Sequence, residues 1–487
     1  MNAVMVALTF ALMAYTIPAS MLAPLLPAIE KAYHVGAVAA VWISLVPLLA
    51  GAALTPSLSR LGDVMGWHKR MALIGLGCLI LGGLLSVASD SLVLLLAGRF
   101  FTGAGAVVYP MVVGMANSSF TPLRRKVAVS LFGAGLMIGF GIGGVLAGWY
   151  LEHHGAFRNV FWGSVVLGVA GLALVGWAAP PDRRPAGFVP RVWWRAVDPW
   201  GALGFALTAF TLDVAFSQGS SWGWGSWRVV ALIVSALVIF AGWIIVERRL
   251  SDPLVPQKVF WSRPVWVSNA LQLLAGFGSY GAIIAASTYA QLPNLPGLGG
   301  FGSGPVAGAW IVVPVECLGV VAAPVTALLS RRMGKGPYLV MGPLVQMIGL
   351  LLAAAYHASY VQLLGSMAVV GVGTGMTLAA STLVYAEDAP ADQVGRLFGM
   401  ATIFAGVGGS LGGAIFGAYA TGETLPGLSL PSARAFEHYW QLCAGLSLLA
   451  ALCACFYLVT YWDGLRGRDK AVVVSAVPER SVSGSAG

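Results

Sequence analysis

The sequence is short of charged residues. Only 9% of its 487 residues are Asp, Glu, Lys or Arg, whereas soluble globular proteins carry about 25%. Hydrophobic residues make up 58% of the chain, and its mean hydropathy is +0.84. A soluble fold is excluded, because so few charged groups cannot cover a surface that faces water on all sides. The apolar runs are about 20 residues long, the length of a helix that crosses a bilayer, and they predict an all-α membrane protein.

Cysteine is scarce, and one well-known nucleotide-binding motif is missing. The five cysteines lie inside predicted spans with no CxxC pair among them, so neither a disulfide framework nor a metal site is predicted. No loop of the form GxxxxGK[ST] occurs, which argues against ATP as an energy source. We therefore expect no cofactor and no enzymatic activity.

The basic residues are distributed unevenly along the chain. The net charge is +9, but with the N-terminus inside, most of the 27 Lys and Arg residues fall in loops on one side of the membrane. The exceptions are Lys31, Arg158, Arg228 and Arg434 outside and Arg99 within a span. This asymmetry predicts a cell-membrane protein with both termini in the cytoplasm. The positive net charge is then explained by the membrane orientation, and we expect the lipid bilayer, not a nucleic acid, as a partner.

The chain resembles itself at a fixed offset. Three pairs lie 268 residues apart: Trp42 and Trp310, Pro56 and Pro324, and Gly66 and Gly334. Such a repeat is typical of transporters built from two halves around a central path. The apolar runs predict fourteen spans, as a six-helix bundle in residues 1–179, a linker with two inserted helices in 180–264, a second six-helix bundle in 265–462 and a disordered cytoplasmic tail in 463–487.

Three ionisable residues are predicted well inside spans: Arg99, Asp213 and Glu316. A charge at membrane depth costs at least about 2.5 kcal/mol, so each needs a partner, a wet cavity or a proton. Glu316 is the leading candidate for binding a proton or a cationic substrate, and the alternative is a protonated structural acid. Asp213 belongs to the inserted pair, where a structural or rim role competes with coupling. Arg99 is either functional or a side chain that snorkels outward.

The loop after the second predicted span contains Asp63, Gly66, Lys69 and Arg70. Gly66 permits a tight turn, and the two basic residues would lie at the cytoplasmic rim. An ordinary positive-inside loop is the simpler interpretation. The run resembles the signature loop of the major facilitator superfamily, Gly-x-Leu-x-Asp-x-x-Gly-x-Lys/Arg-Lys/Arg, with Ser59 in place of the first glycine.

Other positions narrow the resemblance to the fourteen-helix EmrB/QacA-type drug:proton antiporters. Trp42 and Pro56 precede Asp63 as in that family, and Arg99 with Gly103 and Gly105 is similar to its second motif. The resemblance implies the major facilitator fold and proton-coupled export of amphipathic or hydrophobic small molecules by alternating access. It also implies a cytoplasmic gate at Asp63, Gly66, Lys69 and Arg70, coupling through Arg99, and a moving helix with Gly139, Gly141, Gly143 and Gly144.

Two departures from the family pattern keep alternatives open. Ala14 and Tyr15 precede Thr16 and Ile17 where the family commonly has an acidic residue, and Phe140 replaces the proline of a Gly-Pro pair. A weakly coupled facilitator, or an exporter of lipid-like substrates, fits these changes. A non-transporting membrane sensor or scaffold on the same fold is a further alternative. In each transporter hypothesis we expect a small-molecule substrate. In the antiporter we also expect protons as the coupling ion. We expect the protein to be a monomer.

Overall fold

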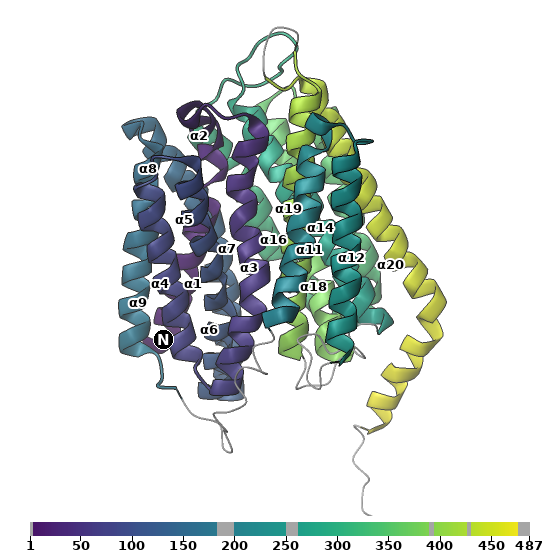
Figure 1. Cartoon of the computed structure of the whole chain (residues 1–487). Helices are drawn as coiled ribbons and strands as arrows, with labels where there is room; N and C mark the ends of the chain where they lie inside the picture. The colour runs from purple at the N-terminus through teal and green to yellow at the C-terminus, as the bar shows by residue number, and fades with distance from the viewer. Residues whose placement is uncertain (1–2, 183–198, 250–261, 389–393, 426–429, 476–487) are drawn as a thin grey trace, which may run out of the picture.

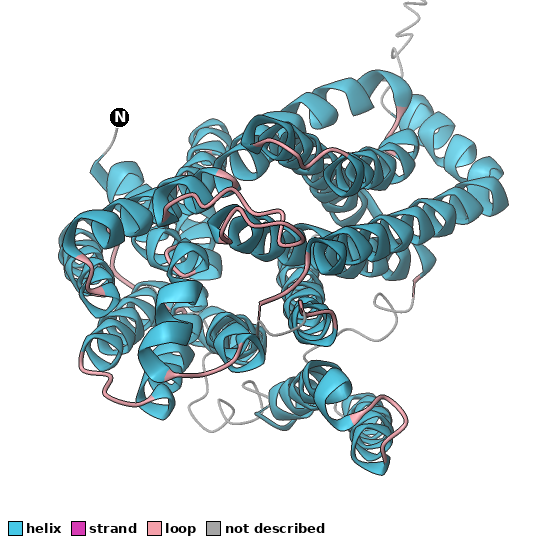
Figure 2. Ribbon diagram, turned by 90° about the horizontal axis from the view of Figure 1, so that it is seen from above, coloured by secondary structure: helices cyan, strands magenta, loops and turns pink. Residues whose placement is uncertain are grey.

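The computed structural model describes residues 3–182, 199–249, 262–388, 394–425 and 430–475. Over these residues the chain is built from helices joined by loops, with one isolated bridge between Thr424 and Pro431. The long helices run roughly side by side (Figure 1), and Figure 2 shows them end-on. Their long apolar stretches are the reason: in lipid every backbone polar group must be satisfied within the chain, which a helix achieves by itself.

The first part of the chain forms a bundle of helices. In order they are α1 (Ala3–Ser20), α2 (Leu26–Tyr33), α3 (Ala37–Met65), α4 (His68–Val87), α5 (Leu92–Ala104), α6 (Val108–Ser119), α7 (Pro122–His154), α8 (Phe157–Val160) and α9 (Trp162–Ala178). Short 3-10 turns, η1 (Ala23–Leu25) and η2 (Gly105–Val107), connect α1 to α2 and α5 to α6. Within this bundle α1 packs against α7 and α9, and α4 packs against α5 and α9.

The second bundle follows an inserted helical pair. The pair is α11 (Pro199–Trp222) and α12 (Trp227–Arg249), and α11 lies against α3 and α19 (Figure 1). The later helices are α14 (Arg263–Gln291), α15 (Pro305–Trp310), α16 (Val312–Met333), α17 (Gly336–Ala355), α18 (Tyr360–Asp388), α19 (Val394–Gly422) and α20 (Ala433–Ser475). The sequence boundary at residue 462 falls inside α20, so the helix continues past the point where a disordered tail is expected, and residues 476–487 lie outside the described ones.

Close backbone contacts recur in the two bundles at the offset found in the sequence. A Cβ atom added to Gly103 on α5 would collide with the backbone of Pro47 on α3. The residues 268 positions later do the same, since a Cβ on Gly371 of α18 would collide with the backbone of Val315 on α16. The turns recur as well, because Gly66 after α3 and Gly334 after α16 both have positive φ, 64° and 78°. The repeat found in the sequence is therefore also present in the helix packing.

The number of spans differs from the sequence prediction. Among the described residues, twelve helices are long and apolar enough to cross a membrane, whereas the apolar runs predict fourteen. The long helices outside that set are α11, with 24 residues, and α19, with 29. Both helices contain residues whose side chains lie outside the described ones, and the count of twelve is made on the described residues alone. The count of fourteen is thus not confirmed.

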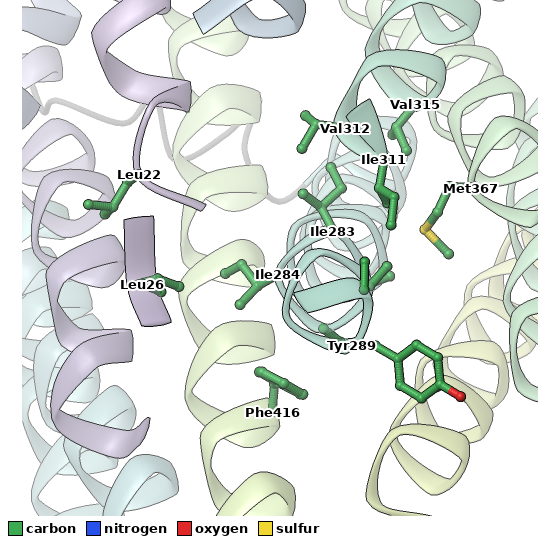
Figure 3. Close-up of a cluster of buried hydrophobic side chains, with 14 of the residues drawn as sticks. Leu22, Leu26, Ile283, Ile284, Tyr289, Ile311, Val312, Val315, Met367 and Phe416 are labelled. Atoms are coloured by element: carbon green, nitrogen blue, oxygen red, sulfur yellow. The ribbon is translucent and has the colours of Figure 1, made fainter. Parts of the chain in front are cut away.

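The largest buried hydrophobic cluster joins the two bundles. It brings Leu22 and Leu26, at the start of the chain, together with Ile284 of α14 and Phe416 of α19 (Figure 3). This cluster lies toward the end of the molecule opposite the basic end, which we define by Lys69, Arg70, Arg249 and Arg263. The two bundles are therefore joined by buried apolar contacts at this end.

Candidate functional site

Arg99 is buried in the first bundle. Its side chain is 1% exposed, and its guanidinium carbon lies 5.6 Å from the centre of the Phe161 ring. None of its three guanidinium nitrogens has a hydrogen-bond partner among the described residues. A buried guanidinium without a partner is costly because it stays protonated. Arg99 therefore does not snorkel to the membrane surface, and its side chain is buried inside the bundle.

Tyr15 on α1 is a titratable group that interacts electrostatically with Arg99. The Tyr15 ring lies 3.5 Å from where a Cβ on Gly105 would be. The same tyrosine interacts with Tyr280 on α14 of the second bundle. Sequence reasoning noticed Tyr15 only as the substitute for a missing acid. The place of Tyr15, where the family commonly has an acid, was the signal that could have marked it as a candidate site residue.

Glu316 on α16 is a second electrostatic neighbour of Tyr280. Glu316 is only partly exposed. Its helical neighbour Cys317 faces the first bundle, with its sulfur 4.0 Å from where a Cβ on Gly141 of α7 would be. Arg99, Tyr15, Tyr280 and Glu316 thus form a series of interacting polar groups that crosses from one bundle to the other. We call these four residues the central polar series.

The second tyrosine of this series was missed by sequence reasoning. Tyr280 packs on α19, where a Cβ on Gly409 would lie 2.8 Å from its ring. A lone tyrosine in an apolar span carries no distinctive spacing, and only the folded structure shows that it interacts electrostatically with both Tyr15 and Glu316. Asp213 on α11 was predicted to be a coupling or rim residue, but its side chain lies outside the described residues.

The four predicted glycines of α7 divide between two neighbours. A Cβ on Gly139 or Gly143 would collide with α1, on Thr16 and Ile17 respectively. Gly141 faces the second bundle. Gly144 lies between the two neighbours, since a Cβ added there would be 3.4 Å from both the Ser20 carbonyl of α1 and the Cβ of Ala309 on α15. Small residues let membrane helices approach closely. The α7 helix accordingly packs tightly within its own bundle while its other face forms the seam with α15 and α16.

The loop that resembles the signature motif is tied to its own bundle. The Lys69 ammonium donates to the carbonyls of Gly176 and Ala179, 2.7 and 2.9 Å away, at the end of α9. Asp182 accepts a hydrogen bond from the Lys69 backbone N–H (2.8 Å) and lies 3.4 Å from Arg70 Nε. A cation at the C-terminal end of a helix stabilises its dipole. Asp63 lies in the last turns of α3, and its side chain is outside the described residues.

The opposite end of the seam holds a polar contact and a cavity. Glu152 at the end of α7 accepts a hydrogen bond from the Val306 backbone N–H (3.0 Å) at the start of α15. The hydroxyl of Tyr360 donates to the carbonyl of Ala307 (2.7 Å). A cavity of about 430 Å³ lies beside them, lined by Glu152, Val306, Ala307, Trp310, Tyr360 and Leu364. Sequence reasoning missed this link between bundles, because it depends on where two distant helix ends meet.

Comparison with known proteins decides the family. The family model of the Major Facilitator Superfamily matches residues 8–413. The chain belongs to this superfamily. It is 27% identical over 405 residues to the tetracenomycin C resistance and export protein of Streptomyces glaucescens, covering 80% of this chain and 70% of that one. It is 23% identical to the multidrug transporter protein MdtP of Bacillus subtilis over 383 residues, which are 77% of this chain and 68% of that protein.

A third relative transports a different class of compound. The uridine/deoxyuridine transporter of Lactococcus lactis is 30% identical over 366 residues, 72% of each chain. Among solved structures, the human organic anion transporter MFSD10 matches with a TM-score of 0.60 at 14% identity, and the nucleoside transporter NupG with 0.63 at 12%. Each match covers 93% of this chain and 99% of the other. These structures establish the fold, and with the relatives they make the protein a transporter of this superfamily.

Proposed function

We propose that this transporter exports amphipathic or hydrophobic small molecules in exchange for protons. The observation that carries the proposal is the central polar series, in which Glu316 is the acid and lies at the seam between the bundles. A carboxyl group in this place can bind a proton when it is exposed to one side and release it on the other. The proposal includes α11 and α19 as spanning helices, for fourteen in all.

One relative supports export as the direction, and a second supports drugs as the substrate class. The names of the tetracenomycin C exporter and of MdtP describe export and multidrug transport. The seam supports alternating access by rocking, because α7 meets α15 and α16 through small residues that allow close sliding contact. In this account Asp63, Gly66, Lys69 and Arg70 belong to the cytoplasmic gate, with Lys69 bonded to the end of α9 and Arg70 paired with Asp182 just beyond it.

A weakly coupled facilitator is the second candidate. It is favoured by Tyr15 in place of the acid that antiporters commonly carry, and by the uridine/deoxyuridine transporter among the relatives. A lipid-like substrate fits the same features, and a sensor or scaffold would transport nothing. These candidates differ from the antiporter in whether a pH gradient drives substrate movement.

The test is efflux of a lipophilic cationic dye from proteoliposomes under an imposed pH gradient. The wild type should show gradient-driven flux, and Glu316→Gln should lose it while the protein still folds. The control is Glu423→Gln, which removes an exposed carboxylate that pairs with His438 away from the seam, and it should behave as the wild type. Wild-type flux that ignores the gradient and survives Glu316→Gln would overturn the antiporter and leave the facilitator.

A further inference from the structure

A row of polar side chains runs between α14 and α18 inside the second bundle. At one end, Tyr385 donates a hydrogen bond to the Asn269 side-chain oxygen (2.8 Å). At the other, the hydroxyls of Ser279 and Thr374 lie 2.7 Å apart. The two helices are antiparallel, since the partner on α18 moves back along the chain as the residue on α14 moves forward. We call these contacts the α14–α18 ladder.

The middle of the ladder has polar groups without partners. Gln272 lies three residues beyond Asn269, and Ser381 lies four residues before Tyr385, so helical spacing places them at the same level on facing sides. Gln272 is 3% exposed and Ser381 is 0% exposed. The Gln272 side-chain nitrogen and the Ser381 hydroxyl have no hydrogen-bond partner among the described residues, and the same is true of the Ser268 hydroxyl and the Asn269 side-chain nitrogen.

Leaving so many buried polar groups unpaired is unfavourable. An unsatisfied buried donor or acceptor costs about 1 to 3 kcal/mol, and proteins commonly meet such needs with buried water that makes two to four hydrogen bonds. Amide donors and a hydroxyl on α14 that face a hydroxyl on α18 suit water, which both donates and accepts, better than a cation. The described part of the ladder carries no charged side chain.

The two ends of the ladder lie near Glu316 and near the basic end of the molecule. Thr374 belongs to the turn of α18 that packs on the turn of α16 bearing Glu316, because a Cβ on Gly319 would lie 3.2 Å from the Gly371 carbonyl. Tyr280, which interacts with Glu316, directly follows Ser279. At its other end the ladder reaches Ser268, five residues from the start of α14 at the basic end.

We propose that ordered water binds between Gln272 and Ser381. It links the Tyr385–Asn269 end of the ladder to the Gln346 amide, which donates to the Ala275 carbonyl and to Ser279 Oγ at 3.0 and 2.9 Å, on a polar path from the basic end of the molecule toward Glu316. Water held there accepts from the Gln272 nitrogen and exchanges hydrogen bonds with the Ser381 hydroxyl. Such a path lets a proton reach Glu316 through the second bundle without passing through the substrate space. The role in proton access depends on the proposed function, whereas the binding of water does not.

Radiolytic hydroxyl-radical labelling of the folded wild type tests the water directly, because radicals form from water beside a buried side chain. Tyr385 and Tyr439 are both fully buried, and the Tyr439 hydroxyl is satisfied by the Gly412 carbonyl at 2.9 Å. We expect labelling of Tyr385 and none of Tyr439. Labelling should be lost in Gln272→Leu combined with Ser381→Ala. Equal absence of labelling at both tyrosines in the wild type would overturn the proposal, and would indicate that Gln272 and Ser381 bond directly.

The proton path is tested by flux. Ser381→Ala, and its combination with Gln272→Leu, should lose pH-driven flux while retaining substrate exchange at equal pH. The control, Ser366→Ala, removes a buried hydroxyl of α18 that already bonds to the Gln362 carbonyl at 2.9 Å, and it should leave both activities unchanged. Full pH-driven flux in the combined variant would refute the path. If the wild type itself shows no pH-driven flux, the proposed function fails, and the labelling still decides the water site.

Discussion

The residues proposed to couple transport are polar groups within apolar helices. Arg99 and Glu316 could be selected from the sequence because charged residues are rare within apolar runs. Tyr15 and Tyr280 could not, since tyrosine is ordinary in membrane proteins and its meaning depends on neighbours from other helices. For the same reason, the contacts of Lys69 with the end of α9 were not foreseeable from the motif, which specifies residue types and leaves their partners open.

One residue outside the spans gives the protein a pH-dependent stability. Burial raises the pKa of Glu30 on α2 from 4.5 to about 7. The folded state then binds a proton more tightly than the unfolded state, so the free energy of unfolding falls as pH rises from about 4.5 to about 7. We expect Glu30→Gln to flatten this part of the profile of thermal unfolding against pH.

The neighbouring Lys31→Gln provides the control for that experiment, since it changes a charge on the same short helix without removing the buried carboxyl. It should keep the slope of the wild type. A Glu30→Gln variant with an unchanged slope would show that this carboxyl is not the group that titrates.

At the scale of helices, the close packing follows from the placement of glycine. The offset of 268 residues was visible in the sequence, and the contacts of Gly103 on Pro47 and of Gly371 on Val315 follow it. The inserted pair could also be expected from the charged, proline-rich segments around it. The end of α20 was harder to predict, because a helix can continue past the apolar run that predicts its span.

Packing of α1 on α7 can be tested at Gly143. A Cβ there would collide with the Ile17 carbonyl and the Ser20 hydroxyl, and overpacking of this kind costs about 1 to 3 kcal/mol. Gly143→Ala should therefore lower the midpoint of thermal unfolding, followed by tryptophan fluorescence in detergent. Gly133→Ala on the same helix, with nothing within 4 Å of the added atom, should leave it equal or higher. Similar midpoints for both variants would contradict the packing described.

At the scale of the whole molecule, the two bundles meet along two seams, α3 with α19 and α7 with α16. They also meet at the end opposite the basic end. Leu45 meets Ala414, Leu49 meets Val407, and Glu152 reaches the start of α15. The sequence predicted two packed halves, but the groups that meet across their seam could not be read from it. Such contacts depend on the rotation of each helix about its axis, which apolar runs without a strong polar face do not specify.

Rocking of the bundles can be tested by a cross-link across this seam. Gly141→Cys on α7 places a thiol beside the native Cys317 of α16, whose sulfur is 4.0 Å from the added Cβ. Mild oxidation should join the bundles, abolish transport and be reversed by a reducing agent. The control Gly133→Cys, which has open space around it, should remain active after oxidation. Full transport in a completely cross-linked protein would exclude movement at this seam.

The account depends most on Glu316 carrying the exchanged proton, and the most direct measurement is of protons themselves. A pH-sensitive dye trapped in proteoliposomes should report proton movement when substrate is added to one side with no gradient imposed. The account predicts proton movement opposite to the substrate in the wild type and none in Glu316→Gln, although that variant still binds the substrate. Substrate movement without proton movement in the wild type, or equal proton movement in the variant, would contradict it.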